Sequence, residues 1–263
     1  MGELITSLQN PHVKRLVKLQ NRRARDKEKA FLIEGYRELL RAVDGEKEIE
    51  HVYYCEELFL GENEHALIRK TGAKSTPVAK HVFEKVSYRD RPDGLIAVAP
   101  TFSQTLAEIP LSTSPFILVA EAIEKPGNLG SILRSADAAG VDALILCDKC
   151  TDLFNPNVVR SSVGTLFTVP VVEGSSKEVH AFLKEKGIQT LAATPDAEEV
   201  YTDVPLTGPV AIVVGTEQLG LSDLWMNQAD LQVKIPMLGH ADSLNVAAAT
   251  TLMLYEVVRQ RTS

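Results

Sequence analysis

The sequence has few of the features that mark secreted and membrane proteins. Its three cysteines are an odd number and too few for a disulfide framework. No apolar run approaches the ~20 residues that a membrane-spanning helix needs. The opening residues, MGELITSLQNPHVKR, lack the apolar core of a signal peptide. We therefore expect a cytoplasmic protein with no membrane partner.

The patterns of metal-dependent, hydrolytic and dinucleotide-dependent enzymes are missing as well. The histidines show no H-x-x-x-H pairing, and Cys147 and Cys150 have C-x-x-C spacing without a second pair. Ser161 and Ser162 stand in no G-x-S-x-G turn. No G-x-G-x-x-G turn follows the first apolar strand of the second half. The sequence thus predicts no metal site, and it supports neither hydrolase chemistry nor an ordinary dinucleotide-binding oxidoreductase.

Positive charge is scarce overall, but it is concentrated at one end of the chain. The formal net charge is −7, whereas residues 1–41 carry ten Lys and Arg against five Asp and Glu. A basic stretch of this kind can bind nucleic-acid phosphates, or it can be the solvated face of a helix. Charge alone leaves both interpretations open. The densest part comprises Lys14, Arg15, Lys18, Arg22, Arg23, Arg25, Lys27 and Lys29.

Apolar periodicity predicts an α/β protein of two domains, covering residues 1–105 and 116–263, with a linker at 106–115. In the first domain, helices are expected at 11–20, after Gly35 and at 63–70, and strands at 30–33, 49–54 and 95–99. In the second, strands are expected at 116–120, 143–147, 167–172, 188–193, 210–214 and 231–235. One helix should begin near Asn128, and a last helix should run over 243–261. Regular alternation of strand and helix in this half indicates a mostly parallel sheet.

Three polar segments follow predicted strands of the second domain, where ligands bind in open α/β sheets. The first, 124–140, carries Asn128 at a helix start and Arg134 one turn beyond Gly130. The second, 213–221, has glycines that let the backbone approach a ligand closely. The third, 234–252, opens the last helix with Ser243-Leu244-Asn245. Taken singly, each segment could be no more than a helix cap, a turn or a solvated charge.

Taken together, these segments resemble the motifs of the SpoU family of the SPOUT methyltransferase superfamily. Their matching residues occur in the family's order, as does the family-like stretch 155–171 with Arg160 and Gly164. In addition, residues 8–39 resemble the amino-terminal substrate-binding domain of larger members that act on ribosomal RNA, a domain related to small RNA-binding ribosomal proteins. The residues that carry the first three motifs are Asn128, Gly130, Arg134, Ala136, Gly140, Gly215, Glu217, Gly220, Leu221 and Ile235 to Val246.

This resemblance implies a methyltransferase that uses S-adenosyl-L-methionine to methylate a ribose 2′-hydroxyl of RNA. It implies a deep trefoil knot in the carboxy-terminal domain and a homodimer with the active site near its interface. Ribosomal RNA is favoured over tRNA as the substrate, because minimal tRNA-acting members usually lack a full amino-terminal domain. A non-catalytic RNA-binding protein of ribosome assembly is the alternative of a different class. Gln218 departs from the glycine that several members have after the glutamate.

Residue roles follow from the same resemblance. The implied catalytic residues are Arg134, Asn128, Glu217, Ser243 and Asn245. The implied cofactor-binding residues, acting mainly through backbone groups, are Thr194, Gly215, Gly220, Ile235, Met237, Ser243, Leu244 and Asn245. The expected RNA-binding residues are Lys14, Arg15, Arg22, Arg23, Arg25 and Arg160. Because a guanidinium holds its proton at neutral pH, we expect Arg134 to act electrostatically and not as a general base.

Overall fold

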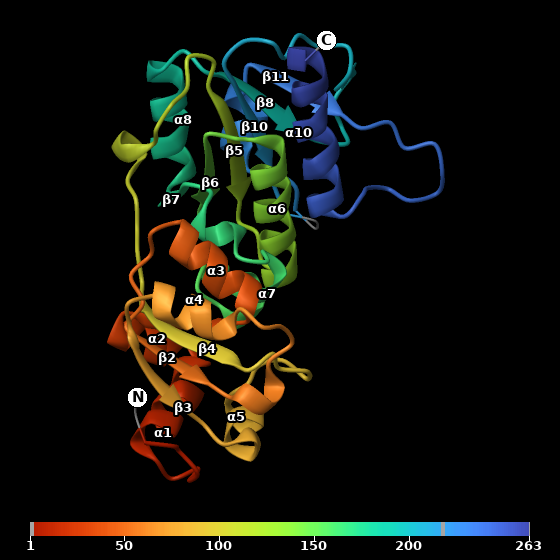
Figure 1. Cartoon of the computed structure of the whole chain (residues 1–263). Coiled ribbons are helices and arrows are strands. Elements are labelled where there is room, and N and C mark those ends of the chain that lie inside the picture. Colours follow the sequence, from red (N-terminus) through yellow and green to blue (C-terminus); the bar gives the residue numbers. More distant parts are fainter. Residues whose placement is uncertain (1–2, 217–218, 263) are drawn as a thin grey trace. The chain divides into compact units, whose positions relative to one another are not determined.

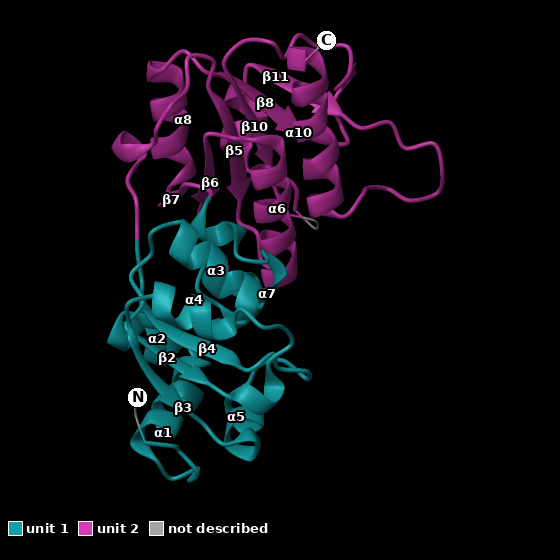
Figure 2. Cartoon of the chain, in the orientation of Figure 1, with its two compact units in different colours: residues 1–102, 152–168 teal, residues 103–151, 169–263 magenta. Residues whose placement is uncertain are grey.

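The computed structural model describes residues 3–216 and 219–262, which fall into two compact units (Figure 2). Unit 1 comprises residues 1–102 and 152–168, and unit 2 comprises 103–151 and 169–263. The stretch 152–168 therefore packs with unit 1, although it lies within the sequence assigned to the second domain. The predicted boundaries at 105 and 115 separate parts of the chain that would fold independently. Packing into units does not measure independent folding, so these boundaries stay a prediction.

Unit 1 is built on a four-stranded sheet in the order β1-β4-β2-β3, in which only β2 and β3 run parallel. The strands expected in this half are confirmed, as are its three expected helices. The strands are β1 (Ala30–Glu34), β2 (His51–Tyr54), β3 (Lys74–Pro77) and β4 (Leu95–Pro100). The helices are α1 (Pro11–Leu19), α2 (Arg22–Glu28), α3 (Tyr36–Asp44), α4 (Glu64–Lys70), α5 (Lys80–Val86), α7 (Pro156–Ser161) and the 3-10 turns η1 (Glu56–Leu58) and η3 (Thr165–Phe167).

The two faces of this sheet bury different partners because successive strand residues point to opposite sides. Leu32 faces the apolar residues of α1 and α5. The neighbouring Phe31 is fully buried on the other side, where its ring meets those of Phe102, Phe154 and Phe167 at 6.3, 4.6 and 6.1 Å. Two of these three partners, Phe154 and Phe167, belong to the stretch 152–168. This aromatic cluster explains why that stretch packs with unit 1.

Arg25 has a structural place that the sequence did not suggest. Its side chain is only 3% exposed, and its Nε and Nη2 donate to Asp152 Oδ2 at 3.0 and 2.5 Å. A third N–H donates to the carbonyl of Leu19 at 2.8 Å. With its donors engaged inside unit 1, Arg25 is not available to bind phosphate, contrary to the expectation from the basic stretch. It joins α2 to the segment 152–168.

Unit 2 is a sheet of seven parallel strands in the order β7-β6-β5-β10-β8-β11-β9, with helices packed on it (Figure 1). The parallel α/β architecture expected from the sequence is confirmed. The strands are β5 (Phe116–Glu121), β6 (Ala143–Cys147), β7 (Val171–Gly174), β8 (Gln189–Ala193), β9 (Glu199–Val200), β10 (Val210–Val214) and β11 (Leu231–Lys234). The helices are α6 (Pro126–Ala139), α8 (Ser176–Glu185), α9 (Asp223–Gln228), α10 (Val246–Thr262) and the 3-10 turn η2 (Leu106–Glu108).

Two expected elements begin later than predicted. The strand expected at 167–172 starts at Val171, because Gly164 in the left-handed region leads into the η3 turn first. The last helix begins at Val246, since Asn245 caps it by accepting a hydrogen bond from the backbone N–H of Ala247 at 3.0 Å. No helix among the described residues is long and apolar enough to cross a bilayer. The trefoil knot stays a prediction about the path of the chain through its loops.

Candidate functional site

Strand order in unit 2 brings the three polar segments to one edge of the sheet. The strands β5, β10, β8 and β11 are consecutive neighbours and all run in the same direction. Their carboxyl ends lead directly to α6, to Gly215, to Thr194 and to Ile235, respectively. Segments that are more than a hundred residues apart in the chain are thereby placed side by side, as binding at the carboxyl ends of parallel strands requires.

Asn128 and Asn245 meet at this edge. The Nδ2 of Asn245 donates to Oδ1 of Asn128 at 3.2 Å, which joins the start of α6 to the start of α10. Further along the same two helices, the hydroxyls of Ser135 and Thr251 are 2.7 Å apart. Two residues that the sequence predicted to be catalytic are therefore in direct contact. The Asn245 side chain makes both bonds: its Nδ2 donates to Asn128, and its Oδ1 accepts from the N–H of Ala247 and caps α10.

Arg134 projects from the outer face of α6. Leu133 beside it is fully buried, whereas the Arg134 side chain is exposed. Within residues 3–216 and 219–262, its guanidinium forms no ion pair with a carboxylate. It is thus a cation whose charge is available to an anionic ligand.

Hydrogen bonds join the described residues on the two sides of the loop after β10. Thr216 and Gly220 exchange backbone hydrogen bonds of 3.0 and 3.2 Å, and the Thr216 hydroxyl accepts from the N–H of Leu219 at 2.8 Å. A Cβ at Gly215 would lie 2.6 Å from the carbonyl carbon of Gly220 and 2.9 Å from the nitrogen of Leu221. Only glycine fits, so backbone lines this part of the edge. Glu217, predicted to be catalytic, lies outside the described residues, as does Gln218.

The other expected cofactor residues are less closely gathered. Thr194 is 8% exposed, and its N–H donates to the carbonyl of Val233 at 2.9 Å, which holds it between β8 and β11. The segment from β11 to α10, however, projects away from the sheet (Figure 1). It carries Met237, Ser243 and Leu244, the last two with exposed side chains. The structure therefore brings Asn128, Asn245, Gly215, Gly220, Thr194 and Ile235 to one edge, and leaves this segment extended.

Sequence reasoning missed Glu121, a buried carboxylate at the last position of β5. Its oxygens accept hydrogen bonds from the hydroxyl of Ser176 at 2.6 Å and from the N–H and hydroxyl of Ser222 at 2.7 Å each. These bonds hold the starts of α8 and α9 against the same strand edge. An acidic residue ending an otherwise apolar strand was the available signal. Its partners are too distant in sequence to be recognised from it.

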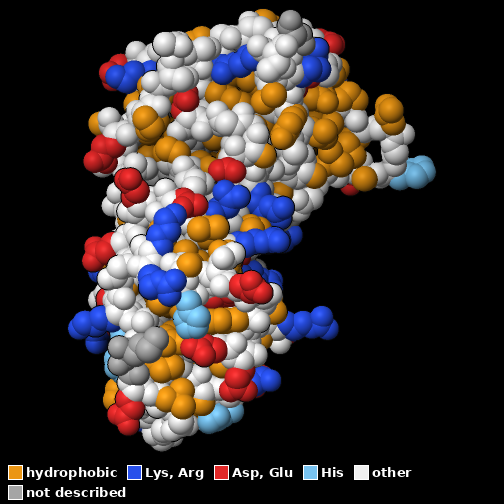
Figure 3. Space-filling view, in the orientation of Figure 1, with side chains coloured by type: hydrophobic (Ala, Val, Ile, Leu, Met, Phe, Trp, Pro, Cys, Tyr) orange, Lys and Arg blue, Asp and Glu red, His pale blue; other side chains and the backbone are white. Residues whose placement is uncertain are grey.

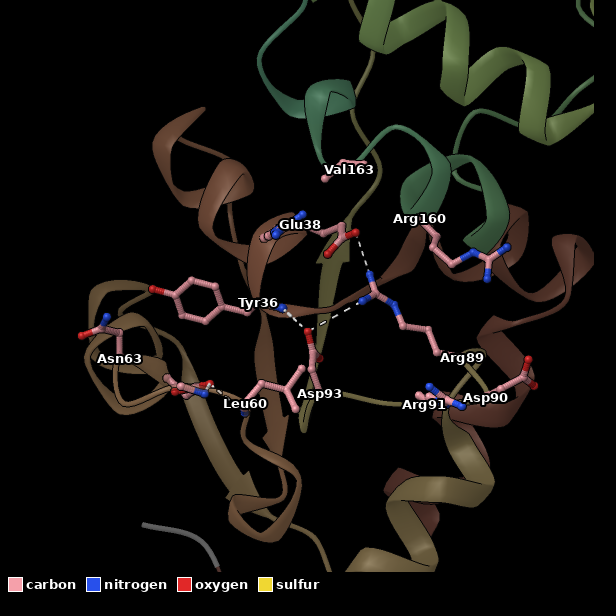
Figure 4. Close-up of a pocket in the computed structure, with 13 residues that line it drawn as sticks. Tyr36, Glu38, Leu60, Asn63, Arg89, Asp90, Arg91, Asp93, Arg160 and Val163 are labelled. Atoms are coloured by element: carbon pink, nitrogen blue, oxygen red, sulfur yellow. Dashed lines mark hydrogen bonds and ion pairs between the residues drawn. The ribbon is translucent and has the colours of Figure 1, made fainter.

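Unit 1 holds a separate cavity of about 790 Å³ (Figure 4). Among the residues expected to bind RNA, only Arg160 lines it. Of the others, Lys14, Arg22 and Arg23 are exposed on α1 and α2. Arg15, by contrast, donates to Glu28 at 2.9 Å and to Glu50 at 2.5 Å, so its charge is already balanced. The predicted basic stretch is therefore weaker as a cationic surface than its composition indicates.

The family model described as "SpoU rRNA Methylase family" matches residues 115–255, and one described as "MRM3-like substrate binding domain" matches residues 10–97. The chain is 30% identical to the 23S rRNA (guanosine(2553)-2′-O)-methyltransferase RlmP of Bacillus subtilis, over 96% of this chain and 98% of that protein.

Two solved structures with bound AdoMet are similar over almost the whole chain. An rRNA methyltransferase from Sinorhizobium meliloti superposes with a TM-score of 0.90 at 29% identity, covering 99% of this chain and 98% of that one. The SpoU methyltransferase AviRb from Streptomyces viridochromogenes superposes with a TM-score of 0.88 at 31% identity, covering 96% and 99%. The edge built from Asn128, the Gly215 turn and Asn245 thus occurs in a chain that matches the family over more than half its length. The protein belongs to the SpoU rRNA methylase family.

Proposed function

We propose that this protein methylates a ribose 2′-hydroxyl of 23S rRNA with S-adenosyl-L-methionine as the methyl donor. The observation that carries the proposal is the contact of Asn128 with Asn245 beside the glycine turn at Gly215, on the edge where β5, β10, β8 and β11 end. Relatives matched over nearly the whole chain are named as rRNA methyltransferases, which favours rRNA over tRNA.

The residues at this edge suit a cofactor held mainly by backbone. At Gly215 a side chain is excluded by the backbone of Gly220 and Leu221, so glycine lets these two parts of the chain pack together and leaves backbone groups at this edge. Thr194 and Ile235 follow the two neighbouring strands and present their backbone at the same edge. When bound, S-adenosyl-L-methionine supplies a methyl group on a positively charged sulfur. In our proposal the extended segment with Met237, Ser243 and Leu244 folds over the bound cofactor.

Arg134 acts on the charge that develops at the ribose oxygen. That oxygen forms a bond to the methyl carbon while the carbon–sulfur bond breaks, and the hydroxyl proton leaves to water or to a neighbouring base. An exposed guanidinium without a carboxylate partner can stabilise the developing alkoxide or hold the adjacent phosphate. Asn128 and Asn245, held by their mutual hydrogen bond, orient the reacting ribose.

Transfer of labelled methyl from S-adenosyl-L-methionine to bulk rRNA and, separately, to bulk tRNA tests this function. We expect label at a ribose position of rRNA and none in tRNA. Label in tRNA alone would support ribose methylation as the reaction but contradict rRNA as the substrate. If the purified protein does not bind S-adenosyl-L-methionine at all, the proposal fails as a whole and the non-catalytic RNA-binding alternative gains support.

We further propose that two copies associate through α10. Leu252 and Tyr255 are 41% and 46% exposed on one face of this helix, and hydrophobic side chains gather over it in Figure 3. An apolar patch of this kind marks a protein–protein contact. Analytical ultracentrifugation should find a dimer in the wild type and a monomer in Leu252→Arg. A wild-type monomer at micromolar concentration would contradict this.

A further inference from the structure

The cavity of unit 1 lies at one end of its sheet, where several segments converge. The starts of α3 and α4, the loop 89–93 and the helix α7 supply its lining (Figure 4). Gly35 precedes α3 with φ of 112°, and a Cβ there would lie 2.5 Å from Nη2 of Arg89. The chain therefore turns tightly into α3 and leaves the space beside it to polar side chains.

A buried group of one arginine and two carboxylates forms the floor of this cavity. Arg89 lies between Glu38, at 2.6 Å, and Asp93, at 3.7 Å, and it also donates to the carbonyl of Glu34 at 2.8 Å. Asp93 in turn accepts from the N–H of Tyr36 at 2.8 Å. Burial raises the pKa of the Glu38 carboxyl above its usual range. The charge of Arg89 is thus used within the protein and is not available to a ligand.

Two oxygens of this floor have no hydrogen-bond partner. They are Oε2 of Glu38 and Oδ1 of Asp93, both buried, and neither accepts a hydrogen bond within residues 3–216 and 219–262. The Glu38 side chain is only 4% exposed. Leaving a buried carboxylate oxygen unpaired costs roughly 1–3 kcal/mol or more, so such atoms call for an explanation. Both atoms are closed off from solvent, so the floor is a packed part of the protein and a ligand would contact the rim above it.

The rim of the cavity carries three arginines whose charges are not balanced in this way. Arg37, Arg91 and Arg160 have exposed side chains, and none of them pairs with a carboxylate in the part of the chain that the structure describes. Arg160 comes from α7, and in Figure 4 its side chain points away from Glu38 and Asp93. Its guanidinium lies 5.8 Å from the centre of the Tyr88 ring. Lys and Arg side chains gather over α3 and α7 on the face shown in Figure 3.

We propose that this cavity binds an unpaired stretch of the RNA substrate, with phosphates on Arg37, Arg91 and Arg160. The proposal rests on the proposed function for the identity of the anion as RNA. An RNA duplex presents a convex, regular surface, whereas unpaired bases can enter a cavity and stack on arginine planes.

This assignment differs from the interpretation that the basic stretch of α1 and α2 holds the RNA. It also gives a role to the segment 152–168, because Arg160 comes from the chain between β6 and β7 of unit 2. RNA bound in the cavity would then be held in part by the sequence of the methyltransferase domain itself.

The test measures binding of a short fluorescein-labelled single-stranded RNA of mixed sequence, and of the same strand annealed to its complement, at several salt concentrations. The full-length wild type is compared with Arg37→Ala/Arg91→Ala/Arg160→Ala and with Arg22→Ala/Arg23→Ala. Arg69→Ala is the matched control, since Arg69 is an exposed arginine of α4 that does not line the cavity. Binding of S-adenosyl-L-methionine is measured for each variant by calorimetry.

We expect the triple variant to weaken single-strand binding and to lower the slope of log affinity against log salt by about 2, which is about 0.7 for each lost phosphate contact. The control variant and cofactor binding should be unchanged. Loss in Arg22→Ala/Arg23→Ala with the triple variant unaffected would place the RNA on α1 and α2 and overturn the proposal. If the triple variant loses affinity for the duplex as much as for the single strand, the claim that the cavity prefers unpaired RNA is wrong.

Failure of the proposed function would look different. Wild-type protein that binds single-stranded RNA through the three arginines, yet neither binds S-adenosyl-L-methionine nor transfers methyl to rRNA, would leave the cavity assignment standing. Methyl transfer to rRNA that the triple variant performs as well as the wild type at limiting RNA would remove the cavity assignment and leave the enzyme.

Discussion

The two units build their candidate sites from different materials. At the sheet edge of unit 2, the site consists largely of backbone and small side chains, brought together because parallel strands end at one level. In unit 1, the cavity consists of long charged side chains from α3, α7 and the loop 89–93, arranged around a buried ionic group.

The difference shows which kind of site can be recognised from sequence. A site made of backbone needs glycines and small polar residues at strand ends, and these form a compact motif such as the turn at Gly215. A site made of side chains needs only that cations converge in space. Sequence does not show whether cations in a basic stretch are free to bind a ligand. Two arginines of the stretch, Arg15 and Arg25, are neutralised by carboxylates of unit 1.

The largest expected effect is on the stability of unit 1. Arg25→Ala leaves Asp152 without its partner at a nearly buried position, and breaking a buried ion pair costs about 3–5 kcal/mol. Trp225 is the only tryptophan and lies in unit 2, so its fluorescence follows that unit. In urea, the transition seen by far-UV circular dichroism should move further than the one seen by fluorescence.

Arg23→Ala serves as the control for this experiment, since that side chain is exposed and should change the free energy of unfolding by no more than about 0.5 kcal/mol. Equal shifts of both transitions would mean that the two units unfold together. The units would then differ in how their sites are built but not in stability.

The next effect in size concerns catalysis in unit 2. Arg134→Ala should lower the rate of methyl transfer to rRNA by roughly 10²–10³, the typical loss when one electrostatic group is removed from a transition state. Binding of S-adenosyl-L-methionine should persist. Arg134→Lys keeps the charge and should recover part of the rate. Full activity of Arg134→Ala would remove this residue from the mechanism.

A smaller loss is expected from crowding the backbone-built site. Gly215→Ala places a methyl group against the backbone of Gly220 and Leu221, and overpacking of this kind costs about 1–3 kcal/mol. Affinity for S-adenosyl-L-methionine should therefore fall by about 10- to 100-fold, while RNA binding by unit 1 is retained. Gly208→Ala is the matched control, because nothing lies within 4 Å of a Cβ there. Equal affinities in the two variants would argue against close backbone approach.

The smallest effect is a difference in thiol reactivity that leaves the fold intact. Burial raises the pKa of Cys147 to about 12 and also raises that of Cys55, whereas Cys150 is exposed. Iodoacetamide at pH 8 should label one thiol rapidly in the native protein and three in urea. Because the folded state favours the protonated Cys147 thiol, its contribution to stability is present at neutral pH and is lost as the pH rises from about 9 towards 12. Two fast thiols in native protein would contradict the burial.

The sequence by itself determined the elements and the motif residues of unit 2. Runs such as 116–120, 143–147 and 210–214 are continuously apolar because both faces of a parallel strand are buried, so their positions can be predicted locally. Asn128 and Asn245 were identified from the resemblance, and the structure places them in contact. The start of the last helix was predicted three residues too early because the capping role of Asn245 depends on a backbone that the sequence does not show.

Only the tertiary structure decided which of these parts are neighbours. The order β5-β10-β8-β11 departs from chain order, and it depends on packing across the whole sheet and not on any local pattern. The same holds for segment 152–168, whose aromatic residues find Phe31, and for Arg25, whose partner Asp152 lies more than a hundred residues away. Local propensity acts over a few residues, whereas burial and ion pairing act over any separation in the chain, so the cavity of unit 1 could be found only in three dimensions.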